Sequence, residues 1–194
     1  MRRTLGGNAA SVLTALSVFL AVLSFERSVY PLLMALTVLV HELGHIALAW
    51  AVGAPVRALG GGPYRFCLYY DPARVSYGRE GLICAGGVIF NLILAAVTLP
   101  FLPASRAEFL FVSNIAAALF NLLPLRMLDG GGVLRCFLLS RRCPEEAERI
   151  SRSVSFSFTV ALFLVSVYAQ LALGGSFSLF ALSVYMIADS VLRG

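Results

Sequence analysis

Residues 31–50 read Pro31-Leu-Leu-Met-Ala-Leu-Thr-Val-Leu-Val-His41-Glu42-Leu43-Gly44-His45-Ile-Ala-Leu-Ala-Trp50. The run is long enough to cross a hydrocarbon core, which needs about 20 helical residues. Three ionisable residues, His41, Glu42 and His45, interrupt it. With Pro31 in the first helical turn, His41 lies about 15 Å along the axis and therefore near mid-membrane. Ionisable groups at that depth cost a few kcal/mol unless paired or metal-bound, so the cluster indicates a functional site.

The spacing of the two histidines predicts a metal site. Residues four apart lie on one face of a helix, one turn above each other, so His41 and His45 can reach the same ion. Glu42 lies about 100° further round the helix, where it can hydrogen-bond a metal-bound water without being a ligand. A catalytic zinc ion takes three protein ligands and one water. Both histidines of the chain are used, so the third ligand must be a carboxylate or a cysteine.

The whole chain has the composition of a membrane protein. Of its 194 residues, 59% are hydrophobic and only 13% are charged, which excludes an ordinary water-soluble domain. We therefore expect an all-α fold and a single polytopic domain over residues 1–194, with no PDZ or C-terminal regulatory domain. Six apolar stretches predict membrane spans, near residues 8–24, 30–52, 81–102, 107–124, 152–173 and 176–192.

The basic residues indicate the orientation in the membrane. All 15 are arginines, and cytoplasmic loops carry the excess of basic residues. If the loops alternate between the two sides, only Arg27 and Arg106 fall on one side and the other arginines share the opposite one. This distribution predicts that both termini are cytoplasmic. The net charge of +5 then reflects membrane topology, and we expect no binding to nucleic acid.

Asp129 is the candidate for the third metal ligand. It follows the fourth span in Asn121-Leu-Leu-Pro124-Leu-Arg-Met-Leu-Asp129-Gly130-Gly131-Gly132, where Pro124 disfavours helix at Leu123 and the glycines permit unusual backbone angles. Such a broken segment is tolerated at membrane depth only if it is buried in protein or lines a wet cavity. Taken alone, Asp-Gly is also typical of a simple turn. The other carboxylates besides Glu42 lie in loops or near span ends: Glu26, Asp71, Glu80, Glu108, Glu145, Glu146, Glu148 and Asp189.

Two motifs carry a family resemblance. His41-Glu42-x-x-His45 together with Asn121-x-x-Pro124-x-x-x-x-Asp129-Gly130 resembles the site-2 protease family of intramembrane zinc metalloproteases. The pattern of six spans is similar to the compact stage IV sporulation protease branch of that family. The resemblance implies one zinc ion per chain, held by His41, His45 and Asp129, with Glu42 as the general acid and base for peptide hydrolysis.

The same resemblance bears on substrate contacts. It implies that Asn121 lies near the bound peptide. Family members often have a Gly-Pro-x-x-Asn segment in the third span, and the stretch Ala85-Gly86-Gly87-Val88-Ile89-Phe90-Asn91 is a loose counterpart. Asn91 is therefore a weaker candidate for a contact with substrate.

The segments around residues 60–77 and 133–144 predict elements outside the spans. Residues 60–70 and 74–77 predict two short strands around an Asp71-Pro72 turn. This hairpin could pair with an unwound substrate by strand addition, or form an interfacial Tyr and Arg belt with no substrate role. Residues 133–142 predict an interfacial amphipathic helix, and Pro144 suits the start of the next helix.

We therefore expect a multi-pass endopeptidase of a bacterial cell membrane that cuts in or beside the membrane segment of a membrane-associated protein. Glu42 would take a proton from the attacking water and pass it to the leaving amine. A transcription regulator, a pro-sigma factor and remnant signal peptides are all suitable substrates. The alternative is a metal-binding membrane transporter, or a non-catalytic scaffold that keeps the metal for structure.

Overall fold

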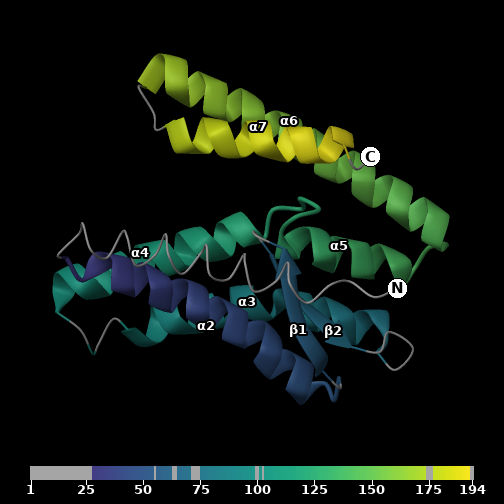
Figure 1. Cartoon of the computed structure of the whole chain (residues 1–194), viewed down its shortest axis with the longest axis horizontal. Helices are drawn as coiled ribbons and strands as arrows, with labels where there is room; N and C mark the ends of the chain where they lie inside the picture. The colour runs from purple at the N-terminus through teal and green to yellow at the C-terminus, as the bar shows by residue number, and fades with distance from the viewer. Residues whose placement is uncertain are drawn as a thin grey trace. The chain divides into compact units, whose positions relative to one another are not determined.

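The computed structural model describes residues 28–54, 56–62, 65–70, 75–98, 101, 103–173 and 177–192. The expected first span, near residues 8–24, lies outside these described residues. The chain divides into two compact units, Met1–Phe120 and Asn121–Gly194. In chain order the elements are α2 (Tyr30–Ala51), β1 (Val56–Gly62), β2 (Arg65–Tyr70), α3 (Tyr77–Thr98), α4 (Ala104–Asn121), α5 (Asp129–Leu139), α6 (Pro144–Leu173) and α7 (Phe177–Leu192) (Figure 1).

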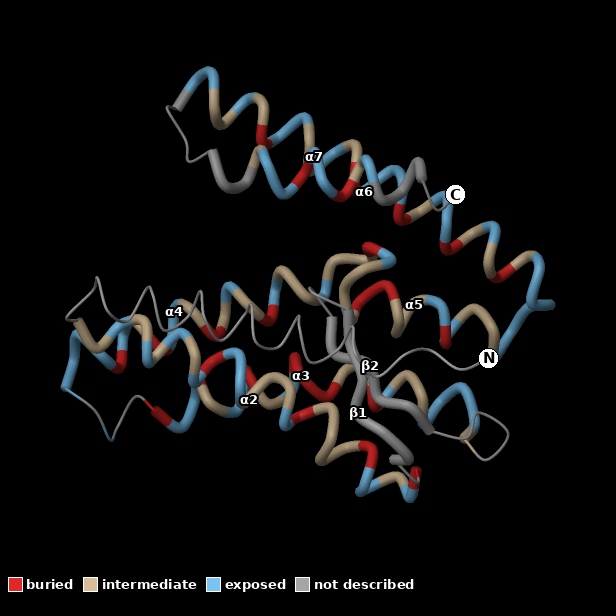
Figure 2. The backbone as a smooth tube through the Cα atoms, viewed as in Figure 1, coloured by how far each residue is buried: buried red, intermediate tan, exposed pale blue. Residues whose placement is uncertain are grey.

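The all-α fold with a short hairpin is confirmed. Helices occupy the five predicted spans that fall within the described residues. Three helices are long and apolar enough to cross a membrane, namely Tyr30–Ala51, Tyr77–Thr98 and Pro144–Ala172. Only 22%, 33% and 11% of their apolar windows are buried inside the protein, so most of their surface suits contact with lipid tails (Figure 2). This is a membrane protein.

Helix α2 begins and ends where its sequence requires. Pro31 occupies the first turn, where its missing N–H costs no hydrogen bond. At the other end Gly53 adopts φ 72°, a left-handed conformation that glycine accepts without strain. The Gly53 N–H then donates to the Trp50 carbonyl and the Ala54 N–H to the Ala49 carbonyl, which closes the helix as a Schellman motif.

Helices α2 and α3 approach each other closely through two glycines. A Cβ carbon on Gly86 would lie 2.6 Å from the carbonyl oxygen of Gly44, and one on Gly44 would meet the Gly86 carbonyl. Small residues allow this backbone contact between membrane helices. Gly44 directly precedes His45, so the crossing brings α3 against the histidine helix. Helix α4 also contacts α2, because the buried Asn114 donates from Nδ2 to the Thr37 hydroxyl at 3.1 Å.

The hairpin prediction placed the reversal at the wrong residues. Strands β1 and β2 pair antiparallel with Gly62 opposite Arg65, so the chain reverses between these residues and not at Asp71-Pro72. Tyr77, predicted to end a strand, is the first residue of α3. Gly62-Pro63 is also a strong turn signal. A reversal there allows the β-favouring run Arg65–Tyr70 to pair along its whole length.

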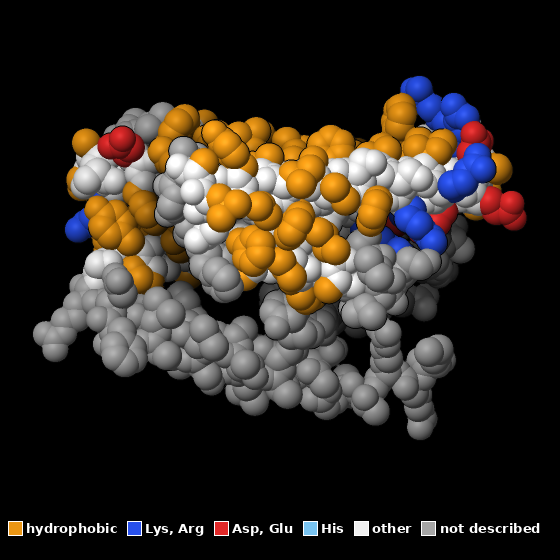
Figure 3. All heavy atoms as spheres, turned by 90° about the horizontal axis from the view of Figure 1, so that it is seen from above, with side chains coloured by type: hydrophobic (Ala, Val, Ile, Leu, Met, Phe, Trp, Pro, Cys, Tyr) orange, Lys and Arg blue, Asp and Glu red, His pale blue; other side chains and the backbone are white. Residues whose placement is uncertain are grey.

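In the second unit, α5 and α6 match the elements predicted after the fourth span. Helix α5 covers most of the predicted amphipathic segment, and α6 begins at Pro144 as expected. Residues 144–173 form one continuous helix of 30 residues, longer than the predicted span. Charged side chains gather at the right-hand end of the view in Figure 3, where α6 begins, and the middle of the view shows apolar side chains among uncharged ones. This distribution suits a helix that leaves the membrane at its N-terminal end.

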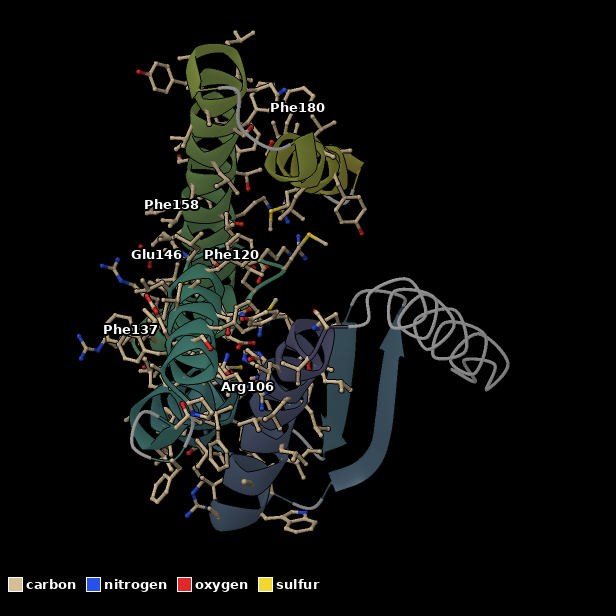
Figure 4. The ribbon with its side chains drawn as sticks, turned by 90° about the vertical axis from the view of Figure 1, so that its left-hand side faces the viewer. Arg106, Phe120, Phe137, Glu146, Phe158 and Phe180 are labelled. Carbon is tan, nitrogen blue, oxygen red and sulfur yellow. The ribbon has the colours of Figure 1, made fainter. Side chains whose placement is uncertain are left out.

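Helix α7 packs against α6. The hydroxyls of Ser166 and Ser183 lie 2.8 Å apart, and both side chains are buried. The Phe180 ring, seen beside α6 in Figure 4, lies 5.9 Å from the ring of Phe163. Buried hydroxyls and small residues at such a contact are typical of helix pairs in membranes.

Candidate metal centre

The two histidines of α2 stand at a distance that suits a shared metal ion. Their Nε2 atoms lie 3.3 Å apart, and the rings meet edge to face at 81°. Two nitrogens bound to one tetrahedral zinc ion, at about 2.0–2.1 Å each, are separated by about 3.3–3.4 Å. The Nε2 pair therefore already has the separation of one edge of a zinc coordination tetrahedron.

The His45 ring is oriented by α3. Its Nδ1 lies 2.8 Å from the carbonyl oxygen of Ile83. Because a carbonyl only accepts, Nδ1 carries the proton and donates it, which leaves the lone pair of the neutral ring on Nε2. Most metal-binding histidines are held by such a bond from the second ring nitrogen.

The His41 ring lies over Gly87 of α3. A Cβ carbon at this position would lie 2.5 Å from Nε2 and 2.6 Å from Nδ1 of His41, so only glycine leaves room for the ring. One turn further along α3, the Nδ2 atom of Asn91 lies 3.2 Å from His41 Nδ1. Asn91 is fully buried, with 0% of its surface exposed.

Asp129 is the first residue of α5, in the second unit. The two glycines after it are required by packing, because a Cβ on Gly130 would meet the Leu122 carbonyl and one on Gly131 the Leu125 carbonyl. The carboxylate thus sits at a helix N-terminus, where the backbone dipole favours negative charge. Its role as the third metal ligand, beside His41 and His45 of the first unit, stays a prediction.

The other two predicted site residues are half-buried. Glu42 follows His41 on α2, and Asn121 is the last residue of α4. Their roles at the site stay predictions. Sequence reasoning missed the contributions of Ile83 and Gly87. A signal was present, since a Gly-Gly pair followed one turn later by asparagine is unusual in an apolar span.

Comparisons with known proteins add to this geometry. The profile of peptidase family M50 matches residues 103–162, which include α4, the segment through Asp129 and the first part of α6. The structure is similar to that of the site-2 protease from Methanocaldococcus jannaschii, with a TM-score of 0.62, 18% identity, and coverage of 94% of this chain and 87% of that chain. No protein with a curated description matches. Part of the chain is thus similar to peptidase family M50, and the chain shares the fold of that site-2 protease.

Proposed function

We propose that this chain is a zinc endopeptidase that hydrolyses a peptide bond in or beside the membrane-embedded segment of a substrate protein. The observation that carries the proposal is the pair of Nε2 atoms 3.3 Å apart on a helix long enough to cross a membrane. At this separation, two histidines of a His-Glu-x-x-His helix can bind one zinc ion, which activates water for peptide hydrolysis. The match of residues 103–162 to the profile of peptidase family M50 supports the same reaction class.

Three residues of this chain would hold the ion. His45 is pre-oriented by the Ile83 carbonyl, His41 lies over Gly87, and Asp129 supplies the third ligand at the start of α5. Two imidazoles and a carboxylate are a donor set that catalytic zinc sites use. When bound there, zinc supplies Lewis acidity and an activated water.

Glu42 performs the proton transfers. As the nucleophilic water attacks the scissile carbonyl carbon, the Glu42 carboxylate takes its proton. The same group then gives that proton to the amine nitrogen as the C–N bond breaks. Asn121 contacts the peptide near the scissile bond and helps to hold it in place, which is the role that the family resemblance implies.

The substrate is a membrane-associated protein. A site on a helix of 22 residues that is largely exposed to lipid is reached most directly from within the bilayer. The chain would be multi-pass, with both termini cytoplasmic, as the arginine distribution predicts. A transcription regulator, a pro-sigma factor and a remnant signal peptide all meet this description.

A comparison of Glu42→Gln with Asp129→Ala tests the proposal. The full chain is purified in detergent and mixed with tagged single-span proteins whose spans contain Asn, Gly or Pro, and with signal peptides. Cleavage is followed by immunoblot and mass spectrometry, and metal content by elemental analysis. Glu42→Gln should keep one zinc per chain and lose cleavage, whereas Asp129→Ala should lose the zinc.

The matched control is Glu108→Gln, which removes an exposed carboxylate from α4 and should change neither quantity. Full cleavage by Glu42→Gln would refute the role of Glu42. Full zinc content in Asp129→Ala would require another third ligand. A metal-binding transporter or scaffold would keep its zinc and cleave nothing.

A further inference from the structure

Asn91 is a buried amide in the middle of an apolar helix. It has 0% exposure, and a polar side chain at such a position needs hydrogen-bond partners. Its Nδ2 atom lies 3.2 Å from Nδ1 of His41, while its Oδ1 atom is buried with no hydrogen-bond partner among the described residues. The amide is thus placed against a metal ligand.

The direction of this hydrogen bond decides which tautomer His41 adopts. If the amide nitrogen donates to Nδ1, the neutral ring carries its proton on Nε2, which then has no lone pair for a metal. Rotating the amide by 180° exchanges its oxygen and nitrogen, so that Oδ1 accepts the N–H of Nδ1. Nε2 then carries the lone pair, in the same tautomer that the Ile83 carbonyl selects for His45.

We propose that Asn91 is a positioning residue whose Oδ1 accepts the His41 Nδ1–H and so fixes the tautomer and ring orientation of this zinc ligand. The inference rests on the proposed zinc site. Asn91 and the Ile83 carbonyl have parallel roles, since one α3 group orients each histidine of α2. Zinc-binding histidines commonly donate to such an acceptor, and its loss weakens binding by about 10–100-fold. Full burial leaves no surface of Asn91 for a substrate to contact.

Zinc affinity separates this role from a merely structural one. The zinc dissociation constant of the full chain in detergent is measured by competition with a chelator. Asn91→Leu, similar in size but without an acceptor, should weaken zinc binding about 10–100-fold. Asn91→Asp, whose carboxylate can accept the same N–H, should bind zinc at least as tightly as Asn91.

Asn114→Leu is the matched control. Asn114 is also 0% exposed and also reaches α2, but it bonds to the Thr37 hydroxyl one turn from His41. Both Leu variants should lower the thermal midpoint, and only Asn91→Leu should lower the zinc affinity. Equal zinc affinities for wild type and Asn91→Leu would overturn the inference while leaving the proposed function intact. A wild-type chain that binds no zinc would instead refute the proposed function.

A second measurement needs no substitution at Asn91. The chain contains 2 histidines, so ¹⁵N-histidine labelling gives a spectrum of two rings. In the zinc-loaded protein, ring couplings should show a proton on Nδ1 of His41, as expected when Nε2 binds the metal. A zinc-loaded His41 ring without a proton on Nδ1 would overturn the inference even if Asn91→Leu fails to fold.

Discussion

Replacing Gly87 by alanine should weaken zinc binding strongly without unfolding the protein. The added Cβ would lie 2.5 Å from Nε2 of His41. Non-bonded heavy atoms settle at about 3.5 Å or more, so the ring must move by about 1 Å. Metal–ligand distances tolerate about 0.2 Å, so the displaced nitrogen no longer coordinates. We expect zinc affinity and cleavage each to fall about 100-fold or more.

The substitution does not weaken helix α3 itself, because alanine favours a helix over glycine by about 1 kcal/mol. The control is Gly78→Ala, on the same helix but with no atom within 4 Å of the added carbon. Metal content, chelator competition and the thermal midpoint of the zinc-free protein are measured for both variants. Gly78→Ala should bind zinc like wild type. Wild-type zinc affinity in Gly87→Ala would refute the placement of the His41 ring over Gly87.

Three further predictions concern stability, each measured by thermal unfolding in detergent. Gly44→Ala should destabilise the protein by about 1–3 kcal/mol, because its Cβ meets the Gly86 carbonyl; an unchanged midpoint would contradict the close crossing of α2 and α3. Gly53→Ala should cost about 1–2 kcal/mol at φ 72° although the space is open, and Gly53→Asn should cost less. Ser166→Ala should cost about 0.6 kcal/mol through its bond to Ser183, whereas the exposed Ser153→Ala should cost nothing.

The sequence predicted the histidine helix well because its signals are local. The apolar run, the proline in its first turn and the glycine after its last turn all act within a few residues, and α2 ends one residue before the predicted bound. The four-residue spacing of the histidines likewise implies one face without knowledge of any other helix. Local signals also located the start of α6 at Pro144.

The remaining features depend on contacts between segments. Gly-Pro and Asp-Pro are comparable turn signals, and the pairing of β1 with β2 decides between them. The position of α3 beside α2 follows from the approach of Gly44 and Gly86, which no spacing within one helix reveals. For this reason Asn91 could be predicted as a residue of interest but not as a neighbour of His41.

X-ray absorption at the zinc edge of the purified full chain tests the central claim most directly. The account predicts one zinc per chain with a shell of nitrogen and oxygen at about 2.0–2.2 Å, including the outer scattering of two imidazoles. A sulfur shell at about 2.3 Å would instead indicate cysteine ligands. That result, or a spectrum without two imidazoles, would contradict a zinc site built on His41 and His45.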